Sequence, residues 1–288
     1  MSKYQDQMNS GKVINRPSDD PVVAVKGMGY RVDLDKNVQY QRNMREAHTW
    51  LDSTDESLDQ VGSVLIRVKE LIVQAANDTN TSEDRQKINE EIQQIKGHLR
   101  DLGNTKIGEN YIFTGIFTNS SLFDENGIDS DTAITQDGLE KSIEINVFDG
   151  IKIQVNTPGV EVFQKVDDFM GELDTILSST NATSEQISAA LGATIGTGVG
   201  TTTIPGLDEL TEQVLQIRAS VGAKQNRLEL MENRLQVQEI NVTKQKSLNE
   251  DTDYAKTITE MVTAESIHQA SLSVGAKIIQ QTLVDFIR

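Results

Sequence analysis

The sequence predicts a mainly α protein with a β-rich insert. We expect a long coiled-coil-like helical bundle built from the N- and C-terminal segments, plus an outer α+β domain formed by the insert. Two observations support this class: apolar residues recur every seven positions in both halves of the chain, and β-branched residues alternate with polar ones between them. Only 36% of the 288 residues are hydrophobic and 5% are aromatic, which argues against one thick globular core.

The first helical seam lies in the N-terminal third. Its seven-residue series is Met44, Leu51, Leu58, Leu65 and Ile72, and the positions three residues later are Ala47, Thr54, Val61, Val68 and Ala75. All of these except Thr54 are apolar, so the pattern predicts an a/d seam over about five heptads. A helix of this length would extend roughly 50 Å. The segment Asn77–Thr81, NDTNT, should end it.

The stretch before this seam has the signals of a helix start. Asp20 can cap the helix, and Pro21 suits its first position. Pro17 restricts Arg16 to extended conformations. We therefore expect a stiff elbow that leads into the long helix. Neither Asp19 nor Asp20 has a nearby histidine or a metal-type spacing, so a scaffold role is favoured.

A second helix follows the break. Thr81 or Ser82 can cap it, and Glu83 and Asp84 in its first turn complement the helix dipole. Its apolar stripe is Ile88, Ile92, Ile95, Leu99 and Leu102, with Gly103 or Gly108 as its end. The short connection predicts an antiparallel helical hairpin.

The segment from Tyr111 to about Pro205 has a different character. The runs YIFTGIF, SIEINVF and IKIQVN favour strands, and Asp149-Gly150 between the last two predicts a type I′ hairpin. One helical stripe interrupts them: Phe163, Val166, Phe169 or Met170, Leu173 and Leu177. The run Gly192–Gly206 is typical of a loop or a flexible edge.

The helical pattern returns at Leu207. The seam series is Val214, Val221, Leu228, Leu235 and Val242, and its partner positions, Ile217, Lys224, Met231, Gln238 and Gln245, are only partly apolar. Beyond Asn249–Asp253 a looser stripe continues through Ile258, Met261, Leu272, Ile279, Leu283 and Phe286. Because neither end of the chain can bury its seam alone, we expect the two ends to come together.

The composition of the chain argues against several classes of function. A net charge of −17 disfavours nucleic acid and anionic membrane as partners. The absence of cysteine excludes disulfides, thiolate catalysis and cysteine-based zinc sites. No apolar run reaches the roughly 18 residues that span a bilayer, and the N-terminal stretch MSKYQDQMNSGK lacks the apolar core of a secretory signal.

Motifs for chemistry are weak. The acidic run Asp124–Asp131 departs from a calcium loop at Ile128 and Asp129, and Gly196–Gly200 lacks the strand-to-helix setting of a dinucleotide loop. The three histidines, His48, His98 and His268, fall on three different helical segments. We therefore expect no enzyme activity, no catalytic residue, no cofactor and no metal site.

The N-terminal stretch SGKVINRPSDDPVVAV, residues 10–25, resembles a family signature. It is similar to that of bacterial flagellins and their relatives, in the version found in the flagellar hook-associated protein 3 family of the hook–filament junction. GENYIFTGIFTNSSLF, RASVGAKQNRLE and TEMVTAESIHQASLSVGAKIIQQTLVDFIR agree with the same family, in the right order. The resemblance covers residues 9–123 and 207–288.

The resemblance implies a structural adaptor between hook and filament. Its partners would be neighbouring copies of itself, a hook-side hook-associated protein and the flagellin filament, with an export chaperone on the C-terminal segment. The protein would be extracellular, exported through the flagellar type III channel. A flagellin-type filament subunit and a soluble coiled-coil binding module remain as alternatives.

The apolar periodicity and the family resemblance together predict the domain boundaries. Residues 1–20 form the elbow and a truncated N-terminal segment, residues 21–110 with 207–249 the bundle, residues 111–206 the variable outer domain, and residues 250–288 the inner-tube helix. The family normally has further residues before the SGK motif. We therefore expect Thr252–Arg288 to be poorly ordered or mispacked in an isolated subunit. The candidate subunit contacts are Asn15, Arg16, Pro17, Asp19, Asp20, Arg218, Ile258, Met261, Leu272, Ile279 and Leu283.

Overall fold

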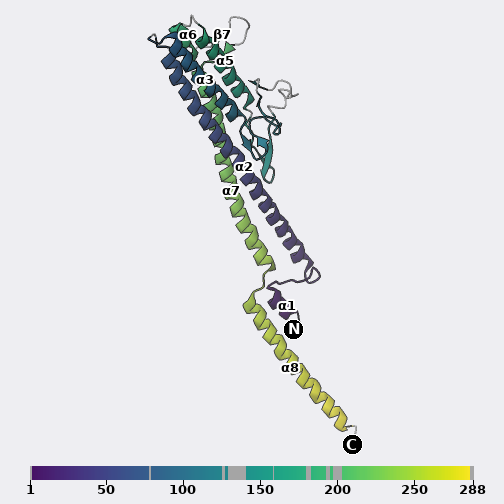
Figure 1. The fold of residues 1–288 in the computed structure, drawn as a ribbon. Helices are drawn as coiled ribbons and strands as arrows, with labels where there is room; N and C mark the ends of the chain where they lie inside the picture. The colour runs from purple at the N-terminus through teal and green to yellow at the C-terminus, as the bar shows by residue number, and fades with distance from the viewer. Residues whose placement is uncertain are drawn as a thin grey trace. The chain divides into compact units, whose positions relative to one another are not determined.

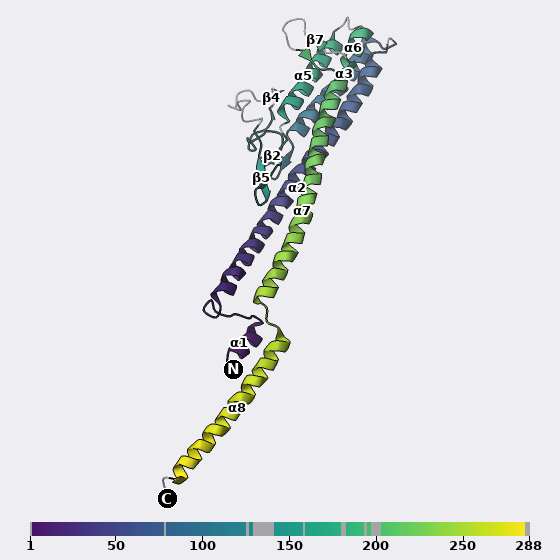
Figure 2. The same cartoon turned by 180° about the vertical axis from the view of Figure 1, so that it is seen from behind.

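The computed structural model describes residues 2–77, 79–124, 127–128, 141–157, 159–179, 183–192, 195–196 and 203–285 (Figures 1 and 2). Contacts group the chain into two units, Met1–Gln39 with Arg234–Arg288, and Tyr40–Asn233. The first unit combines segments far apart in the sequence, so the two ends of the chain belong to the same unit. The expectation that the ends come together is confirmed.

Helices make up most of the described chain. They are α1 (Ser2–Ser10), α2 (Pro21–Ala75), α3 (Ser82–Gly103), α5 (Val160–Ser178), α6 (Ser184–Gly192), α7 (Leu207–Glu250) and α8 (Tyr254–Asp285). Among the described residues, the strands form four antiparallel pairs: β1 (Lys106–Ile107) with β2 (Asn110–Tyr111), β3 (Phe123–Asp124) with β4 (Gly127–Ile128), β5 (Glu144–Phe148) with β6 (Ile151–Gln154), and β7 (Ile195–Gly196) with β8 (Thr203–Ile204). The predicted class, mainly α with a β-rich insert, is confirmed, although the strands of the insert are short and helices α5 and α6 lie among them.

The seam of α2 forms part of the core of the unit Tyr40–Asn233. Every member of the predicted a and d series from Met44 to Ala75 is buried, including Thr54, whose hydroxyl donates to the Trp50 carbonyl. Polar pairs between α2 and α7 flank the seam: Asp52 with Gln225, Asp55 and Asp59 with Arg218, and Lys69 with Asp208. These pairs run in opposite directions along the two helices, so they fix an antiparallel register.

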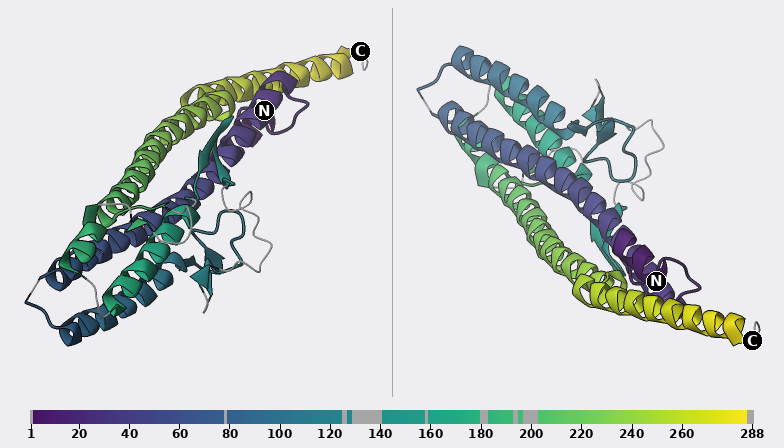
Figure 3. Two further views of the ribbon diagram at one scale, coloured as in Figure 1. Left: turned by 90° about the horizontal axis from the view of Figure 1, so that it is seen from above. Right: turned by 90° about the horizontal axis from the view of Figure 1, so that it is seen from below.

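Helix α3 begins where the sequence predicts. The Thr81 hydroxyl accepts from the Asp84 backbone N–H, and the Asp84 carboxylate accepts from the Thr81 N–H, which completes a capping box. The Thr81 hydroxyl and backbone N–H lower the pKa of Asp84. Further along, Arg100 of α3 holds Asp167 of α5 through two hydrogen bonds of 2.7 and 3.0 Å. Figure 3 shows the two helices side by side.

The insert departs from the prediction in its turns. Asp149-Gly150 does connect β5 and β6, but only Gly150 has a positive φ, +70°, so the predicted type I′ turn is wrong. The register of the hairpin shifts between Asn146 and Phe148, as at a β-bulge.

Two further segments of the insert also differ. In YIFTGIF only Tyr111 belongs to a strand. The following turn buries Ile112 and Phe113 and places Gly115 at φ +65°, because Phe113 packs on Phe163 of α5. Helix α6 falls where no helix was predicted. Most of the predicted loop Gly192–Gly206 and of the acidic run Asp124–Asp131 lies outside the described residues.

In the other unit, α1 packs against α8 (Figure 1). The Gln7 side chain is buried and donates a 2.6 Å hydrogen bond to the Val13 carbonyl. Helix α8 begins after a break at Asp251–Asp253, where the Asp253 carboxylate caps the N–H groups of Ala255 and Lys256. This break lies within Asn249–Asp253, the segment at which the sequence separates the two apolar stripes.

Candidate functional site at the elbow and the C-terminal helix

The elbow between α1 and α2 is built by two aspartates. The Asp20 carboxylate accepts from the N–H groups of Val22 and Val23, as expected of the cap of α2. The Asp19 carboxylate accepts from the N–H groups of Arg16 and Asn15, and these bonds lower its pKa. The side chains of Asn15, Arg16 and Pro17 stay exposed on this turn. The five elbow candidates therefore lie together, two as scaffold and three as free surface.

Residues just before the elbow pair with the link between α7 and α8. The Val13 N–H donates to the Glu250 carbonyl at 2.7 Å, and the Thr252 N–H donates to the Gly11 carbonyl at 3.0 Å. Lys12 and Asp251 face each other in this short antiparallel bridge. The bridge joins the two ends of the chain by main-chain hydrogen bonds.

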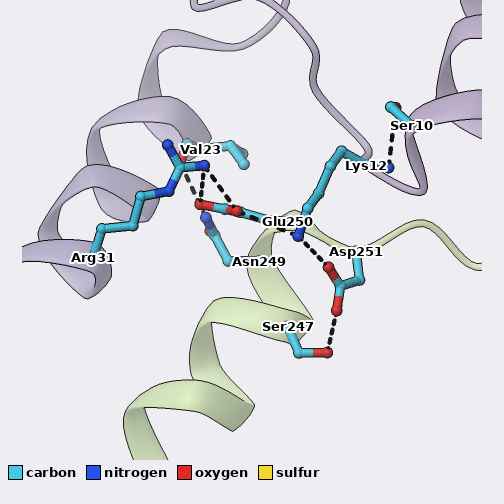
Figure 4. Close-up of polar contacts among 8 residues, drawn as sticks. All are labelled: Ser10, Lys12, Val23, Arg31, Ser247, Asn249, Glu250 and Asp251. Atoms are coloured by element: carbon cyan, nitrogen blue, oxygen red, sulfur yellow. Dashed lines mark hydrogen bonds and ion pairs between the residues drawn. The ribbon is translucent and has the colours of Figure 1, made fainter. Parts of the chain in front are cut away.

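A buried carboxylate lies beneath the bridge. The Glu250 side chain is only 3% exposed, and Arg31 Nη2 contacts both of its oxygens at 3.0 Å. Lys12 Nζ approaches Glu250 Oε2 at 3.5 Å. Figure 4 shows the two cations reaching the carboxylate from different segments, Arg31 from α2 and Lys12 from the bridge. Burial of a carboxylate is costly unless it is paired in this way.

Gly27 makes room for this carboxylate. A Cβ atom on Gly27 would overlap the Glu250 carboxylate group. A glycine inside a helix costs roughly 0.5–1 kcal/mol relative to alanine, so the close approach of Glu250 gives a physical reason for its presence.

An outer layer of polar contacts surrounds Glu250. Lys12 Nζ donates to Asp251 Oδ1 at 2.6 Å, and the Ser247 hydroxyl donates to Asp251 Oδ2 at 2.5 Å. The hydrogen bond with Asp251 raises the pKa of Lys12, and the reciprocal bond lowers the pKa of Asp251. Asn249 ties α7 to α2 by donating to the Val23 carbonyl at 3.0 Å.

A shallow hollow of about 170 Å³ adjoins the junction. The residues that line it are Lys12, Ile14, Asn15, Arg16, Pro17, Ala24, Met28, Arg31 and Glu250. Its floor is mostly apolar, and Met28 is 52% exposed. The exposed elbow candidates therefore share a surface with an apolar side chain of α2.

Helix α8 carries the second group of candidates. Ile258 is 44% exposed and Leu272 is 61% exposed, while Met261 is half-buried. Val262, Ile267 and Val274 add to the exposed apolar surface. Ile279 and Leu283 belong to α8, but their side chains lie outside the described residues.

Arg218 lies in the other unit, away from the elbow in the sequence. Its guanidinium bonds to the carboxylate of Asp55 at 2.8 Å and also pairs with Asp59, and these bonds raise its pKa. Both partners lie on α2.

The sequence interpretation missed Lys12, Gly27, Arg31 and Glu250. A glycine inside a predicted helix was an available signal, because it marks a close approach. Nothing in the spacing pointed to its partner, since Glu250 lies more than 200 residues away.

Other kinds of site are not seen where the structure can be read. Among the described residues, no three histidine or acidic side chains lie close enough together to hold a metal ion. No described helix combines the length and apolarity needed to cross a membrane.

Family comparison assigns the two helical regions. The model of the bacterial flagellin N-terminal helical region matches residues 1–118, and that of the C-terminal helical region matches residues 204–287. The chain is 28% identical to flagellar hook-associated protein 3 of Escherichia coli, over 93% of this chain and 87% of the relative. It is 26% identical to flagellin of Bacillus subtilis, over 97% of this chain and 89% of the relative.

Solved structures share the fold. A flagellar hook-associated protein from Vibrio parahaemolyticus has a TM-score of 0.65 at 19% identity, covering 81% of this chain and 99% of the other. The flagellar junction protein from Legionella pneumophila has a TM-score of 0.53 at 13% identity, covering 79% and 100%. The two regions that the family models match are the ones that the bridge between Lys12 and Asp251 connects. Because the two family regions match residues 1–118 and 204–287, the chain belongs to the bacterial flagellin family.

Proposed function

We propose that this protein is a structural subunit of the bacterial flagellum that joins hook to filament. The two matched family regions, together with relatives named as hook-associated or junction proteins, support an adaptor. In this proposal, residues 250–288 contribute the inner-tube helix, residues 21–110 with 207–249 the bundle, and residues 111–206 the outer domain.

The observation that carries the proposal is the exposed apolar surface of α8. Described side chains such as Ile258, Ile267 and Leu272 face solvent in the single chain. Full burial of each is worth about 1.5–3 kcal/mol. Neighbouring copies would supply that burial, so that the end of the chain completes its packing only during assembly. A head-to-side contact of this kind propagates as a helical tube and does not close as a dimer.

The contact candidates separate by their intrachain roles. We place Asn15, Arg16 and Pro17 at subunit contacts together with the α8 stripe, Ile258, Met261, Leu272, Ile279 and Leu283. Asp19 and Asp20 would act through the shape of the elbow, because their carboxylates bond to it. Arg218 ranks last, because Asp55 and Asp59 already hold it.

Export and delivery follow from the same proposal. The chain would leave the cell through the flagellar type III channel, with a chaperone covering the apolar stripe of α8 until assembly. Co-purification of the chain with such a chaperone, lost on deletion of residues 254–285, would test this step.

Complementation tests the function directly. The full-length gene is expressed in a strain that lacks its own hook-associated protein 3 but keeps its hooks. The expected result is that filaments reappear on existing hooks and that motility returns. Hooks that stay bare while the protein is exported would contradict the proposal.

Stoichiometry separates an adaptor from a filament subunit. Sheared flagella are analysed for the amount of this protein relative to the hook and filament proteins. An adaptor occurs in few copies per hook, whereas a flagellin is in large excess. Absence from intact hook–filament preparations would instead favour a soluble coiled-coil binding module.

A further inference from the structure

We propose that Glu250 makes the link between α7 and α8 conditional on the N-terminal elbow. The buried carboxylate can be fully paired only when Lys12 is delivered to it, so α8 would be held in place only after both chain ends have met. The structural part of this proposal stands by itself, and its consequence for assembly rests on the proposed function.

The first step is the burial of Glu250. The carboxylate lies at the last residue of α7, at 3% exposure, in a space that exists because residue 27 is glycine. A buried carboxylate must be paired with a cation. Removal of one member of a buried ion pair destabilises a protein far more than replacement of the whole pair by apolar residues. The end of α7 is therefore sensitive to each of its cations.

The second step is the origin of the two cations. Arg31 is carried by α2 and reaches both oxygens of Glu250 at 3.0 Å. Lys12 is carried by the segment that precedes α2, and it arrives only when residues 11–13 pair with residues 250–252. Arg31 can therefore contact Glu250 as soon as α2 and α7 pack. Lys12 can contact Glu250 only when residues 11–13 are paired with residues 250–252.

The third step is the effect on α8. The break Asp251–Asp253 lies between the helices, and the same lysine bonds to Asp251 within it. The Thr252 N–H, which no helix uses, is paired by the Gly11 carbonyl. When residues 11–13 are not paired with residues 250–252, the Thr252 hydrogen bond and the Lys12 contacts are lost together. The connection between α7 and α8 is then no longer held by the N-terminal segment.

The test is amide hydrogen exchange on the full chain, with Val13 and Thr252 as reporters, since their N–H groups form the bridge. The Lys12→Met variant should increase exchange at Thr252, and Gly27→Ala should do the same by displacing the carboxylate. Amides of the seam around Leu65 verify that each variant is folded. Matched controls are Lys244→Met on α7 and Glu265→Gln on α8, both exposed, which should leave Thr252 unchanged.

A double-mutant cycle assigns the effect to Glu250. Contacting pairs typically couple by about 2- to 150-fold in an equilibrium constant. We expect Lys12→Met to increase exchange less in the Glu250→Gln background than in the native chain. The same cycle with Asp251→Asn measures the outer contact. Equal effects with and without Glu250, or coupling to Asp251 alone, would overturn the proposal.

Complementation with Lys12→Met separates this proposal from the proposed function. Filament growth should fall for this variant relative to the native gene. If the native gene restores filaments and Lys12→Met does so equally well, the proposed consequence for assembly is wrong and the adaptor function stands. If the native gene fails, the adaptor function falls, while the exchange result still decides the structural part.

Discussion

The two units of the chain use the same kind of side chain in opposite ways. In the unit Tyr40–Asn233, Leu65 of α2 is fully buried. In the unit that holds both chain ends, Leu272 of α8 is 61% exposed. Both lie on helices with an apolar stripe. An apolar stripe therefore predicts that a helix face will be buried. Whether it is buried within one molecule depends on which other segments of the same chain pack against it.

The units also differ in how polar groups are used. In the bundle, pairs such as Lys69–Asp208 are half-exposed and flank an apolar core, so each contributes little energy but fixes register. At the elbow junction, Glu250 is itself buried and the pairing lies at the centre. Polar contacts thus set register in the bundle and set the chain connection at the elbow.

Hydrogen exchange should show the largest contrast. Amides of Leu51–Ile72 should exchange only through global unfolding, because their side chains form the core. Amides of α8 should open locally, and we expect them to exchange at least about 100-fold faster. Measurement by mass spectrometry on the isolated subunit checks this. Equal protection of the two segments would contradict the comparison.

Truncation of one leucine in each unit is the next test. Leu65→Ala should lower the free energy of unfolding by about 2–5 kcal/mol, because it leaves a cavity in a packed core. Leu272→Ala should change it by less than about 0.5 kcal/mol, since the side chain is exposed in the single chain. Urea unfolding followed by circular dichroism gives both values.

The same pair is then compared in assembly. Leu272→Ala should impair filament growth on hooks although its stability is native. Normal growth with this variant would remove Leu272 from the subunit contacts.

A smaller effect is expected at Arg218. Arg218→Ala should lower the melting temperature of the subunit only slightly, because the pairs with Asp55 and Asp59 are partly exposed and screened by solvent. Arg227→Ala on the exposed face of α7 is the matched control and should be neutral. Thermal unfolding compares the two. A variant with native stability and defective assembly would show instead that Arg218 acts between subunits.

Protonation of single aspartates by acid should have the smallest effect on local stability. It should act in both units, because Asp84 lies in one and Asp19 in the other. The lowered pKa values of Asp84 and Asp19 mean that the stability contributed by these two carboxylates is complete above the ordinary carboxyl pKa, about 3.9, and is lost as the pH falls through the lowered values. At pH 7, Asp84→Asn and Asp19→Asn should speed local exchange at the start of α3 and at the elbow. These differences from the native chain should vanish in strong acid. A difference that persists there would mean that the carboxylate charge is not the cause.

The elements that local signals specify were predicted well. The seam from Met44 to Ala75, the cap at Asp20 and the start of α3 at Thr81 all follow from residues within a few positions of one another. One error arose where a distant contact outweighs local preference: YIFTGIF turns away from a strand where Phe113 packs on Phe163. A separate error concerns Asp149, which does not take the positive φ that its turn signal suggests.

The candidate site divides in the same way. By itself, the sequence determined that two apolar ends require partners and that an elbow precedes α2, because periodicity and caps are local properties of a chain. Only the tertiary structure decided that Glu250 is buried against Gly27 and paired by Lys12 and Arg31. The cost of burying a carboxylate depends on charges brought close in space, and segments more than 200 residues apart can supply them only after the chain has folded.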